Sequence, residues 1–435
     1  MHVSIPVLLV ATLAPAGSTV AQDDDVPAEL LEAVEEIQAQ VEAIRGLEFK
    51  RPVGLRVASA EDLSRYLAER MDEWTTPEEL ENQDLVAKLT GLLPADEDLF
   101  ATQMELIESQ VGGYYDPATD TFSLMEGLVG GGLARVILAH ELTHALDDQH
   151  FDLDGGLEAR KDHTDALWAY QSVVEGSATA VMNRWTLEQM QGGGGLSAAD
   201  MEEAANMGAD VLERMQPFLW KPMLGAYLRG SAFLAKTDSV LKASMTMPTS
   251  DELDRAFREP PLSSEQILHP ERYWDADERD DPREVRLHLE GLPEDVSVLD
   301  VDTFGELQLG FVVEPPKKRK GVKGQLGVLG ARYTSKAVEG WGGDRWALLA
   351  RGEARALVLR TLWDDGDEAE EFADAARDRR LVDHVQESLG QLALARGLEA
   401  SCYSVDLVGE EVRVVFAVGM DAEAGVALRD ALISL

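Results

Sequence analysis

Residues 136–145 read VILAHELTHA, an apolar stretch that carries His140 and His144 four positions apart. On a helix, side chains four residues apart lie on the same face, with Cβ atoms roughly 5–6 Å apart. Two imidazoles at that distance can bind one zinc ion, and Glu141 would lean beside the metal, where it can hold and deprotonate a water. The stretch therefore predicts a buried helix with a zinc site and Glu141 as its general base.

The scarcity of histidine argues against a chance occurrence of this pattern. The chain has 8 histidines among 435 residues, so HExxH arises by chance in fewer than about 3 % of such chains. The alternative is a pair of core histidines and a glutamate that are satisfied by hydrogen bonds. Burying a charged side chain in an apolar helix without a partner is costly, which favours the metal site.

A zinc site that performs chemistry needs a third protein ligand and one position left for water. Glu175 is the best candidate, because it lies among apolar residues in the middle of the next expected helix, in the segment SVVEGSA. The small residues that follow it would let this helix pack close to the first. Glu175 could instead be an exposed helix glutamate, and His150 or His163 could be the third ligand.

HELTH followed by a helix that contains EGSA resembles the gluzincin group of zinc metallopeptidases, in which two histidines and a downstream glutamate hold the metal. The resemblance implies that His140, His144 and Glu175 bind one Zn²⁺ per chain. It also implies that Glu141 is the general base of a zincin-like domain that hydrolyses peptide bonds.

The chain departs from the thermolysin-like members of this group at one position. Those members place an aspartate four residues after the ligand glutamate to orient a histidine, and here that residue is Thr179. Asp147 or Asp148 is expected to accept the hydrogen bond instead. The wider pattern is similar to secreted or surface-attached microbial proteins without an assigned physiological role, in the segments 113–116, 140–153, 174–178, 260–270 and 340–345.

Two further segments could frame the site. In zincin folds an edge strand lies above the metal and pairs with an extended substrate. The hairpin arm with Gly113 and Tyr114 resembles that strand, and its glycines would let a substrate backbone approach closely; an ordinary hairpin is the alternative. His269, in a loop before Pro270, could stabilise the oxyanion formed at the substrate carbonyl, or could be a structural loop histidine.

The charge of the chain excludes some partners. It carries 39 basic and 81 acidic residues, a formal net charge of −42. This excess argues against nucleic acid and against anionic membrane surfaces, because both favour basic proteins. The single cysteine, Cys402, allows neither an internal disulfide nor a cysteine-based zinc site. The partner that the resemblance to zinc metallopeptidases implies is a protein or peptide substrate.

The first residues have the character of a signal peptide. Residues 3–14 are apolar, and small residues precede Gln22 as a cleavage site. No later apolar run reaches the length of a membrane-spanning helix, so no stable span is expected. These features predict a secreted, periplasmic or cell-surface location.

Periodicity and turn residues predict an α+β protein in four parts. Signal peptide 1–21 precedes an N-terminal helix within 22–46, a zincin-like domain at 47–280, and a linker with a small α+β domain at 281–435. The charged, proline-containing segment 275–282 is the expected boundary. The zincin-like domain should contain an edge β-hairpin, an active-site helix at 133–149 and a ligand helix at 162–190. The last domain should contain helices at 331–339, 367–376 and 422–435 and strands at 346–350, 356–362 and 412–418.

The expected function is zinc-dependent hydrolysis of peptide bonds. The alternative is a non-catalytic, zinc-stabilised secreted or surface binding protein that has kept the metal site. The presence of Glu141 argues against the alternative, because a purely structural zinc site needs no general base.

Overall fold

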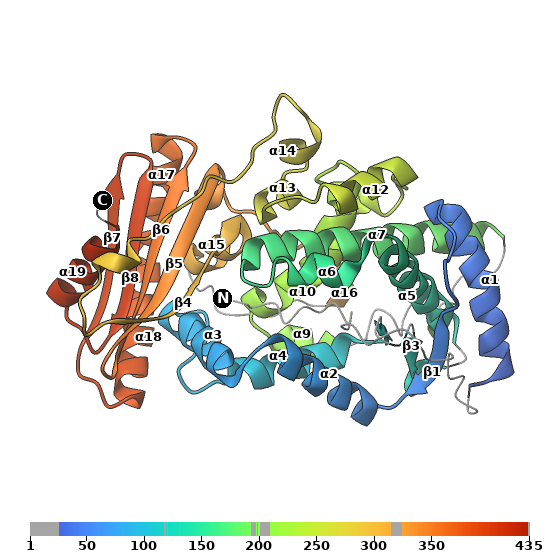
Figure 1. The fold of residues 1–435 in the computed structure, drawn as a ribbon, viewed down its shortest axis with the longest axis horizontal. Helices are drawn as coiled ribbons and strands as arrows, with labels where there is room; N and C mark the ends of the chain where they lie inside the picture. Colours follow the sequence, from blue (N-terminus) through green and yellow to red (C-terminus); the bar gives the residue numbers. More distant parts are fainter. Residues whose placement is uncertain are drawn as a thin grey trace.

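The computed structural model describes residues 26–116, 119, 121–129, 131–192, 197, 199–200, 209–314 and 324–433. These residues form the mixed α+β structure that the sequence predicts, with a helical part that includes a small three-stranded sheet, and a five-stranded sheet covered by helices. In Figure 1 the helical part lies to the right and the five-stranded sheet to the left. The expected signal peptide lies outside the described residues.

The helical part runs from α1 to α14. Its elements are α1 (Ala28–Arg45), β1 (Gly54–Ala58), α2 (Ala60–Trp74), α3 (Pro77–Leu89), α4 (Leu99–Gln110), β2 (Gly113–Asp116), β3 (Thr121–Met125), η1 (Glu126–Leu128), α5 (Gly132–Phe151), α6 (Leu153–Glu158), α7 (Thr164–Gln191), α9 (Ala209–Arg214), α10 (Pro217–Leu234), α11 (Val240–Ala243), α12 (Ser250–Arg258), α13 (Ser264–Leu268) and α14 (Glu271–Trp274). None of the described helices is long and apolar enough to span a membrane.

Local sequence signals set the ends of several of these helices. At the start of α2, the Ser59 side chain accepts a hydrogen bond from the Asp62 amide while the Asp62 carboxylate accepts one from the Ser59 amide. Thr76 and Glu79 cap α3 in the same reciprocal way. Such pairs satisfy the free amides of the first turn, so short stretches of sequence are enough to start these helices.

The two long helices that carry the zinc motif form the centre of the helical part. α5 packs against α7, and α10 crosses α7. The crossing is close because two glycines meet there: a Cβ on Gly176 would collide with the backbone of Gly230, and a Cβ on Gly230 would collide with the backbone of Ser172. Gly176 therefore makes room for α10, whereas Ser177, the small residue after it, contacts Asp147 of α5.

A small sheet with the strand order β1-β3-β2 lies beside α5. β1 runs parallel to β3, and β2 pairs with β3 in the antiparallel hairpin that the sequence predicts, with Gly113 opposite Leu124. β2 is therefore an edge strand of this sheet. It starts close to α5, since a Cβ on Gly112 would come within 2.6 Å of the Ile137 side chain.

The C-terminal part is built on an antiparallel sheet with the strand order β4-β5-β6-β8-β7. Its elements are η2 (Leu289–Gly291), β4 (Ser297–Asp302), α15 (Gly305–Val313), α16 (Gly324–Leu329), η3 (Lys336–Val338), β5 (Trp341–Arg351), β6 (Ala354–Trp363), α17 (Gly366–Ala376), α18 (Arg379–Ala395), β7 (Ser401–Val408), β8 (Glu411–Val418) and α19 (Ala422–Ile433). The strands expected at 346–350, 356–362 and 412–418 and the helices expected at 367–376 and 422–435 correspond to five of these elements.

Alternate residues of the strands pack against different helices. Trp346 and Leu348 belong to the hydrophobic cluster that includes α17 and α18, whereas Ala347 and Leu349 pack with residues of α19 such as Leu432. This alternation follows from the two-residue period of a β-strand. Helices therefore cover both faces of the sheet, with α19 at its outer side in Figure 1.

The helix expected at 331–339 is wrong. Only η3, at Lys336–Val338, is helical there, and the chain on its N-terminal side runs as a loop. Tyr333 packs in this loop against Gly225 of α10, where a Cβ would come within 2.9 Å of the tyrosine ring. Packing against a distant helix thus overrides the local helical propensity of this segment.

The helical part and the five-stranded sheet pack directly on each other. One hydrophobic cluster extends from Leu85 in α3 and Trp168 in α7 to Phe416 in β8. At the start of α7, the Thr164 amide donates a 2.9 Å hydrogen bond to Asp302 of β4. The ligand helix is therefore anchored at one end to the C-terminal sheet.

Candidate metal centre

The two histidines of α5 and the glutamate of α7 meet in the interior. His140 Nε2 and His144 Nε2 are 3.0 Å apart, and Glu175 Oε2 lies 3.2 Å from the first and 3.4 Å from the second. All three residues are buried, with 7 %, 5 % and 3 % of their surface exposed. The structure thus brings together the three residues that the sequence predicts as metal ligands.

The spacing of these three atoms fits a zinc ion. Zinc binds imidazole nitrogen and carboxylate oxygen at about 2.0–2.2 Å in a tetrahedral arrangement, which puts the ligand atoms about 3.3–3.5 Å from one another. The observed separations of 3.0, 3.2 and 3.4 Å are close to these values. Glu175 Oε2 is moreover buried without a hydrogen bond, a condition that a bound cation would relieve.

Tyr227 of α10 completes the surroundings of the ligands. Its ring is stacked on the His140 ring, with centroids 5.6 Å apart and planes 18° apart. Its hydroxyl lies within hydrogen-bonding reach of Glu175. Burial, together with the negative charges of Glu175 and Glu141, raises the pKa of Tyr227 well above its ordinary value. The hydroxyl therefore stays protonated and can donate a hydrogen bond to Glu175.

Tyr227 could not be predicted from the sequence. No motif or spacing in α10 marks this residue, and it reaches the metal centre only because α10 crosses α7 where Gly176 meets Gly230. A helix crossing between segments so far apart in the chain leaves no local signal that a single sequence could have revealed.

Glu141 lies beside the ligands and reaches toward the small sheet. Its carboxylate accepts a hydrogen bond from the backbone amide of Tyr115 in β2. Burial raises the pKa of Glu141 to about 8, against the opposing influence of the His140 charge and the Tyr115 amide, while the charge of Glu175 adds to the rise. A carboxyl group with a pKa near neutrality is suited to exchange protons with a reacting water.

Glu175 is held in the opposite state. Burial raises its pKa, but the two histidines, with His144 and His140 at 3.4 and 3.2 Å from its oxygen, outweigh burial and bring the pKa down to about 2. Glu175 is therefore kept ionised, the state in which a carboxylate can bind a metal, whereas the pKa of Glu141 lies near neutral pH.

The outer nitrogens of the ligand histidines have no hydrogen-bond partner among the described residues. Nδ1 of His140 and Nδ1 of His144 are both buried and unpaired. Asp147 bonds to Arg45, and Asp148 accepts a hydrogen bond from the backbone at the start of α6. The expectation that one of these aspartates orients a ligand histidine is therefore wrong.

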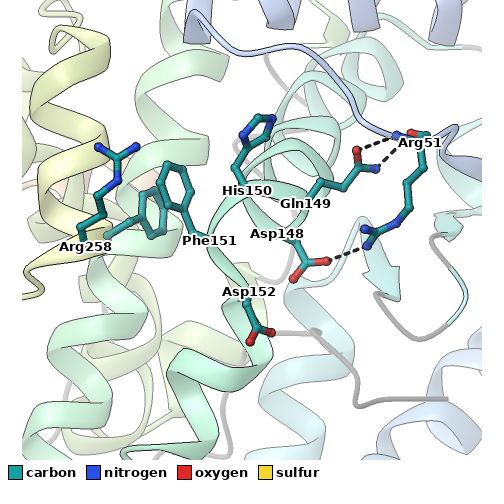
Figure 2. A pocket seen from close by; sticks show the side chains of 8 residues that line it. Arg51, Asp148, Gln149, His150, Phe151, Asp152 and Arg258 are labelled. Atoms are coloured by element: carbon teal, nitrogen blue, oxygen red, sulfur yellow. Dashed lines mark hydrogen bonds and ion pairs between the residues drawn. The ribbon is translucent and has the colours of Figure 1, made fainter. Parts of the chain in front are cut away.

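The two rival ligands lie elsewhere. His150 lines a pocket of about 530 Å³ at the C-terminal end of α5 (Figure 2). Its Nε2 is 2.8 Å from the Glu48 carbonyl oxygen. His163 caps α7, since its Nδ1 accepts a 3.3 Å hydrogen bond from the Ala166 amide. Neither histidine belongs to the cluster around Glu175.

His269 is placed outside the metal centre. It follows α13, and its Nε2 lies 3.1 Å from a carboxylate oxygen of Glu306 in α15. α13 docks on the first turn of α7, where the Ser264 amide donates to Asp165. At 1.5 Å per residue, that turn and Glu175 are roughly 15 Å apart along the helix. His269 is thus paired with Glu306 and does not belong to the cluster around Glu175, and its expected role at the oxyanion stays a prediction.

Gly113 and Tyr114, the two residues expected to bind substrate, offer no side chain for contact with a substrate. Tyr114 is fully buried, with its ring stacked on Tyr66 at 4.5 Å and its hydroxyl accepting a 2.7 Å hydrogen bond from Arg56. A Cβ on Gly113 would collide with the ring of Phe122. The glycine serves the packing of the hairpin, and contact between Gly113 and a substrate would be through its backbone.

Comparison with known proteins concerns the C-terminal sheet alone. Residues 295–427 match a family described as a domain of unknown function (DUF8575). The matched stretch starts just before β4 and extends into α19, so it excludes α5 and α7. No curated protein and no solved structure matches the chain. The function of the metal centre therefore rests on its own geometry.

Proposed function

We propose that the protein is a zinc-dependent metallopeptidase of the zincin type, in which His140, His144 and Glu175 bind the metal and Glu141 is the general base. The observation that carries this proposal is the convergence of three ligand atoms, 3.0–3.4 Å apart, beside a buried glutamate with a raised pKa. The pairing of α5 with α7 and the position of the edge strand β2 beside α5 support a zincin-like architecture.

Residues of the chain surround the metal position with the groups that hydrolysis requires. Zinc, when bound, polarises the scissile carbonyl and lowers the pKa of a water toward about 7. Glu141 takes a proton from the attacking water and passes it to the leaving nitrogen, so the proton count balances. Tyr227 holds Glu175 by its hydroxyl and His140 by its ring, and thereby keeps two ligands in place.

The edge strand β2 is suited to hold an extended peptide next to Glu141. Residues of an antiparallel strand alternately bond to the partner strand and point their backbone groups away from it. The Met125 amide bonds to the Gly112 carbonyl at 3.1 Å, so the amide and carbonyl of Gly113 face the open edge. The Tyr115 amide faces the same way, in agreement with its bond to Glu141. A peptide added along this edge would pass its scissile bond beside the base.

The proposed substrates are proteins or peptides met outside the cytoplasm. The signal-peptide character of residues 1–21 and the strongly acidic composition support a secreted, periplasmic or cell-surface hydrolase. A net charge of −42 also disfavours nucleic acid as a partner.

The second candidate is a non-catalytic, zinc-stabilised binding protein. A fourth protein ligand would close the coordination sphere and favour this function. Among the described residues the cluster contains three ligands, and Glu141 is not one of them. Three ligands leave the position that a reacting water occupies in catalytic zinc sites, so we prefer the hydrolase.

Metal analysis and peptide digestion test the proposal. The purified protein is expected to contain about one zinc per chain and to cleave members of a proteome-derived peptide library. Glu141→Gln should keep the zinc and lose turnover by about 10²–10⁴-fold, whereas Glu126→Gln, an exposed glutamate on η1, should change neither. Full activity of E141Q, or a protein that takes up no zinc on titration, would overturn the proposal.

A further inference from the structure

A second group of carboxylates lies where the helical part, the segment 275–285 and the five-stranded sheet meet. Glu265 belongs to α13, Asp280 to the segment 275–285, and Asp364 to the turn between β6 and α17. Each places one carboxylate oxygen within 4.8 Å of the other two. Three distant stretches of the chain thus bring negative charge to one point, away from the histidines of α5.

Among the described residues, none forms a hydrogen bond or an ion pair with the carboxylate of Glu265. Only 2 % of the residue is exposed. Arg272 acts on it only through its charge, and this arginine is already paired with Asp280 at 3.0 Å. A buried carboxylate without a donor or a cation is costly, so the site calls for a positive ligand.

Asp280 and Asp364 are positioned by their backbones. The Asp280 amide donates to the Arg272 carbonyl at 2.9 Å, and the Gln266 side chain donates to the Asp280 carbonyl at 2.6 Å. The Asp364 amide donates to the Gly340 carbonyl at 2.9 Å. The two carboxyl groups lie within hydrogen-bonding reach of each other, so a shared proton or a shared cation must separate their charges.

Nearby arginines neutralise the cluster only in part, since Arg272 pairs with Asp280 alone among the described residues. Arg283 lies 4.0 Å from Asp364 and is shared with Glu410 at 3.6 Å. Behind the cluster, Glu306 and Glu368 each have one buried carboxylate oxygen without a hydrogen-bond partner. Burial, followed by repulsion from Glu306, Asp280 and Asp364, raises the pKa of Glu265 to about 9. Negative charge therefore exceeds positive charge at this junction.

We propose that Glu265, Asp280 and Asp364 bind a calcium ion that fastens the segment 275–285 to the five-stranded sheet. The ligand set is all oxygen, which suits a hard divalent cation and not zinc. Calcium takes six to eight oxygens, so water would complete the shell around the three carboxylates. Asp364 is exposed and Asp280 is half-buried, which leaves the ion a way in from solvent.

The position of the site gives the ion a structural task. Asp364 lies inside the stretch 295–427 that matches the domain of unknown function, whereas Glu265 and Asp280 lie outside it. The ion therefore ties that domain to the helical part. Binding of calcium would also release the proton of the Glu265 carboxyl group, because a carboxylate ligand must be ionised.

Calcium titration of the full-length protein tests the proposal. Saturating calcium should raise the Tm by about 2–5 °C, since a ligand that binds only the folded state stabilises it. Calcium should also slow proteolytic cleavage at the exposed residues 275–279. Both effects should disappear in Glu265→Gln and in Asp364→Asn, the latter an exposed position that tolerates replacement. Glu278→Gln, an exposed carboxylate of the same segment, should keep both.

Three outcomes would contradict the calcium site. If calcium changes neither Tm nor cleavage in the wild-type protein, or if its effects persist in Asp364→Asn, the site does not bind calcium and Glu265 is a neutral, protonated acid. A response to zinc at this site without a response to calcium would overturn the assignment as well.

Discussion

Ser177 donates a hydrogen bond of 2.6 Å to Asp147, and this contact joins the two helices that carry the proposed zinc ligands. Asp147 lies one turn after His144 on α5, and Ser177 lies just after Glu175 on α7. The other carboxylate oxygen of Asp147 accepts a 2.7 Å bond from Arg45, which is fully buried at the end of α1. The N-terminal helix therefore supplies the counter-charge for the contact that holds the ligand helices together.

Loss of the Arg45 guanidinium should destabilise the protein strongly. Arg45→Met leaves Asp147 buried without its counter-charge, and we expect a loss of about 3–5 kcal/mol in the free energy of unfolding, measured by denaturant titration. Arg135→Met is the matched control, because it removes a solvent-exposed ion pair with Glu36 and should cost at most about 1 kcal/mol. Equal losses in the two variants would show that the buried ion pair contributes no more to the free energy of unfolding than the exposed one.

Zinc should contribute to folding through Glu175. Removal of the metal with a chelator should lower the Tm, because zinc binds the folded state. Glu175→Ala should lose zinc affinity first and peptide hydrolysis as a consequence, with partial recovery of both in excess zinc. Glu188→Ala changes an exposed glutamate of the same helix and should bind zinc normally. Full zinc occupancy in Glu175→Ala, determined by elemental analysis, would place the third ligand elsewhere.

The hydroxyl of Tyr227 should strengthen metal binding. Tyr227→Phe keeps the ring stacked on His140 but removes the group that reaches Glu175. Zinc affinity, measured by competition with a chromogenic chelator, should fall by about 10–100-fold, the usual effect of losing a group that orients a ligand. In Tyr333→Phe the lost hydroxyl is buried without a partner near the same helix, and zinc affinity should not change. A normal affinity in Y227F would reduce Tyr227 to a packing residue.

The helices that carry the site could be predicted from local patterns. The active-site helix expected at 133–149 corresponds to α5, and the ligand helix expected at 162–190 corresponds to α7. Apolar spacing and end signals are properties of short stretches, so a single sequence contains them. The segment around Tyr333 could not be predicted in this way, because its contact with α10 joins residues far apart in the chain.

In the candidate metal centre, too, the residues with a local sequence pattern could be predicted and those that depend on distant contacts could not. His140 and His144 could be paired because the helix alone sets their spacing, and Glu175 could be added because a buried carboxylate needs a cation. For Tyr114, the alternation of a strand leaves open which face is buried until its pairing with β3 and its stacking on α2 are known. Tyr227 depends entirely on the crossing of two helices, for which the sequence offers no local pattern.

The open edge of β2 predicts a periodic pattern in substrate recognition. A peptide that adds to this edge would form backbone hydrogen bonds through every second residue, and one of these residues would pair with the amide and carbonyl of Gly113. N-methylation of a cleaved peptide, one position at a time, should therefore lower kcat/KM at alternate positions only. Each loss should be roughly 2- to 12-fold, which corresponds to one net hydrogen bond. Tyr114→Phe is the matched control, because it removes a hydroxyl bond to Arg56 within the buried hairpin and should leave kcat/KM unchanged. Equal losses at successive positions, or no loss at any, would mean that the peptide does not bind along this strand.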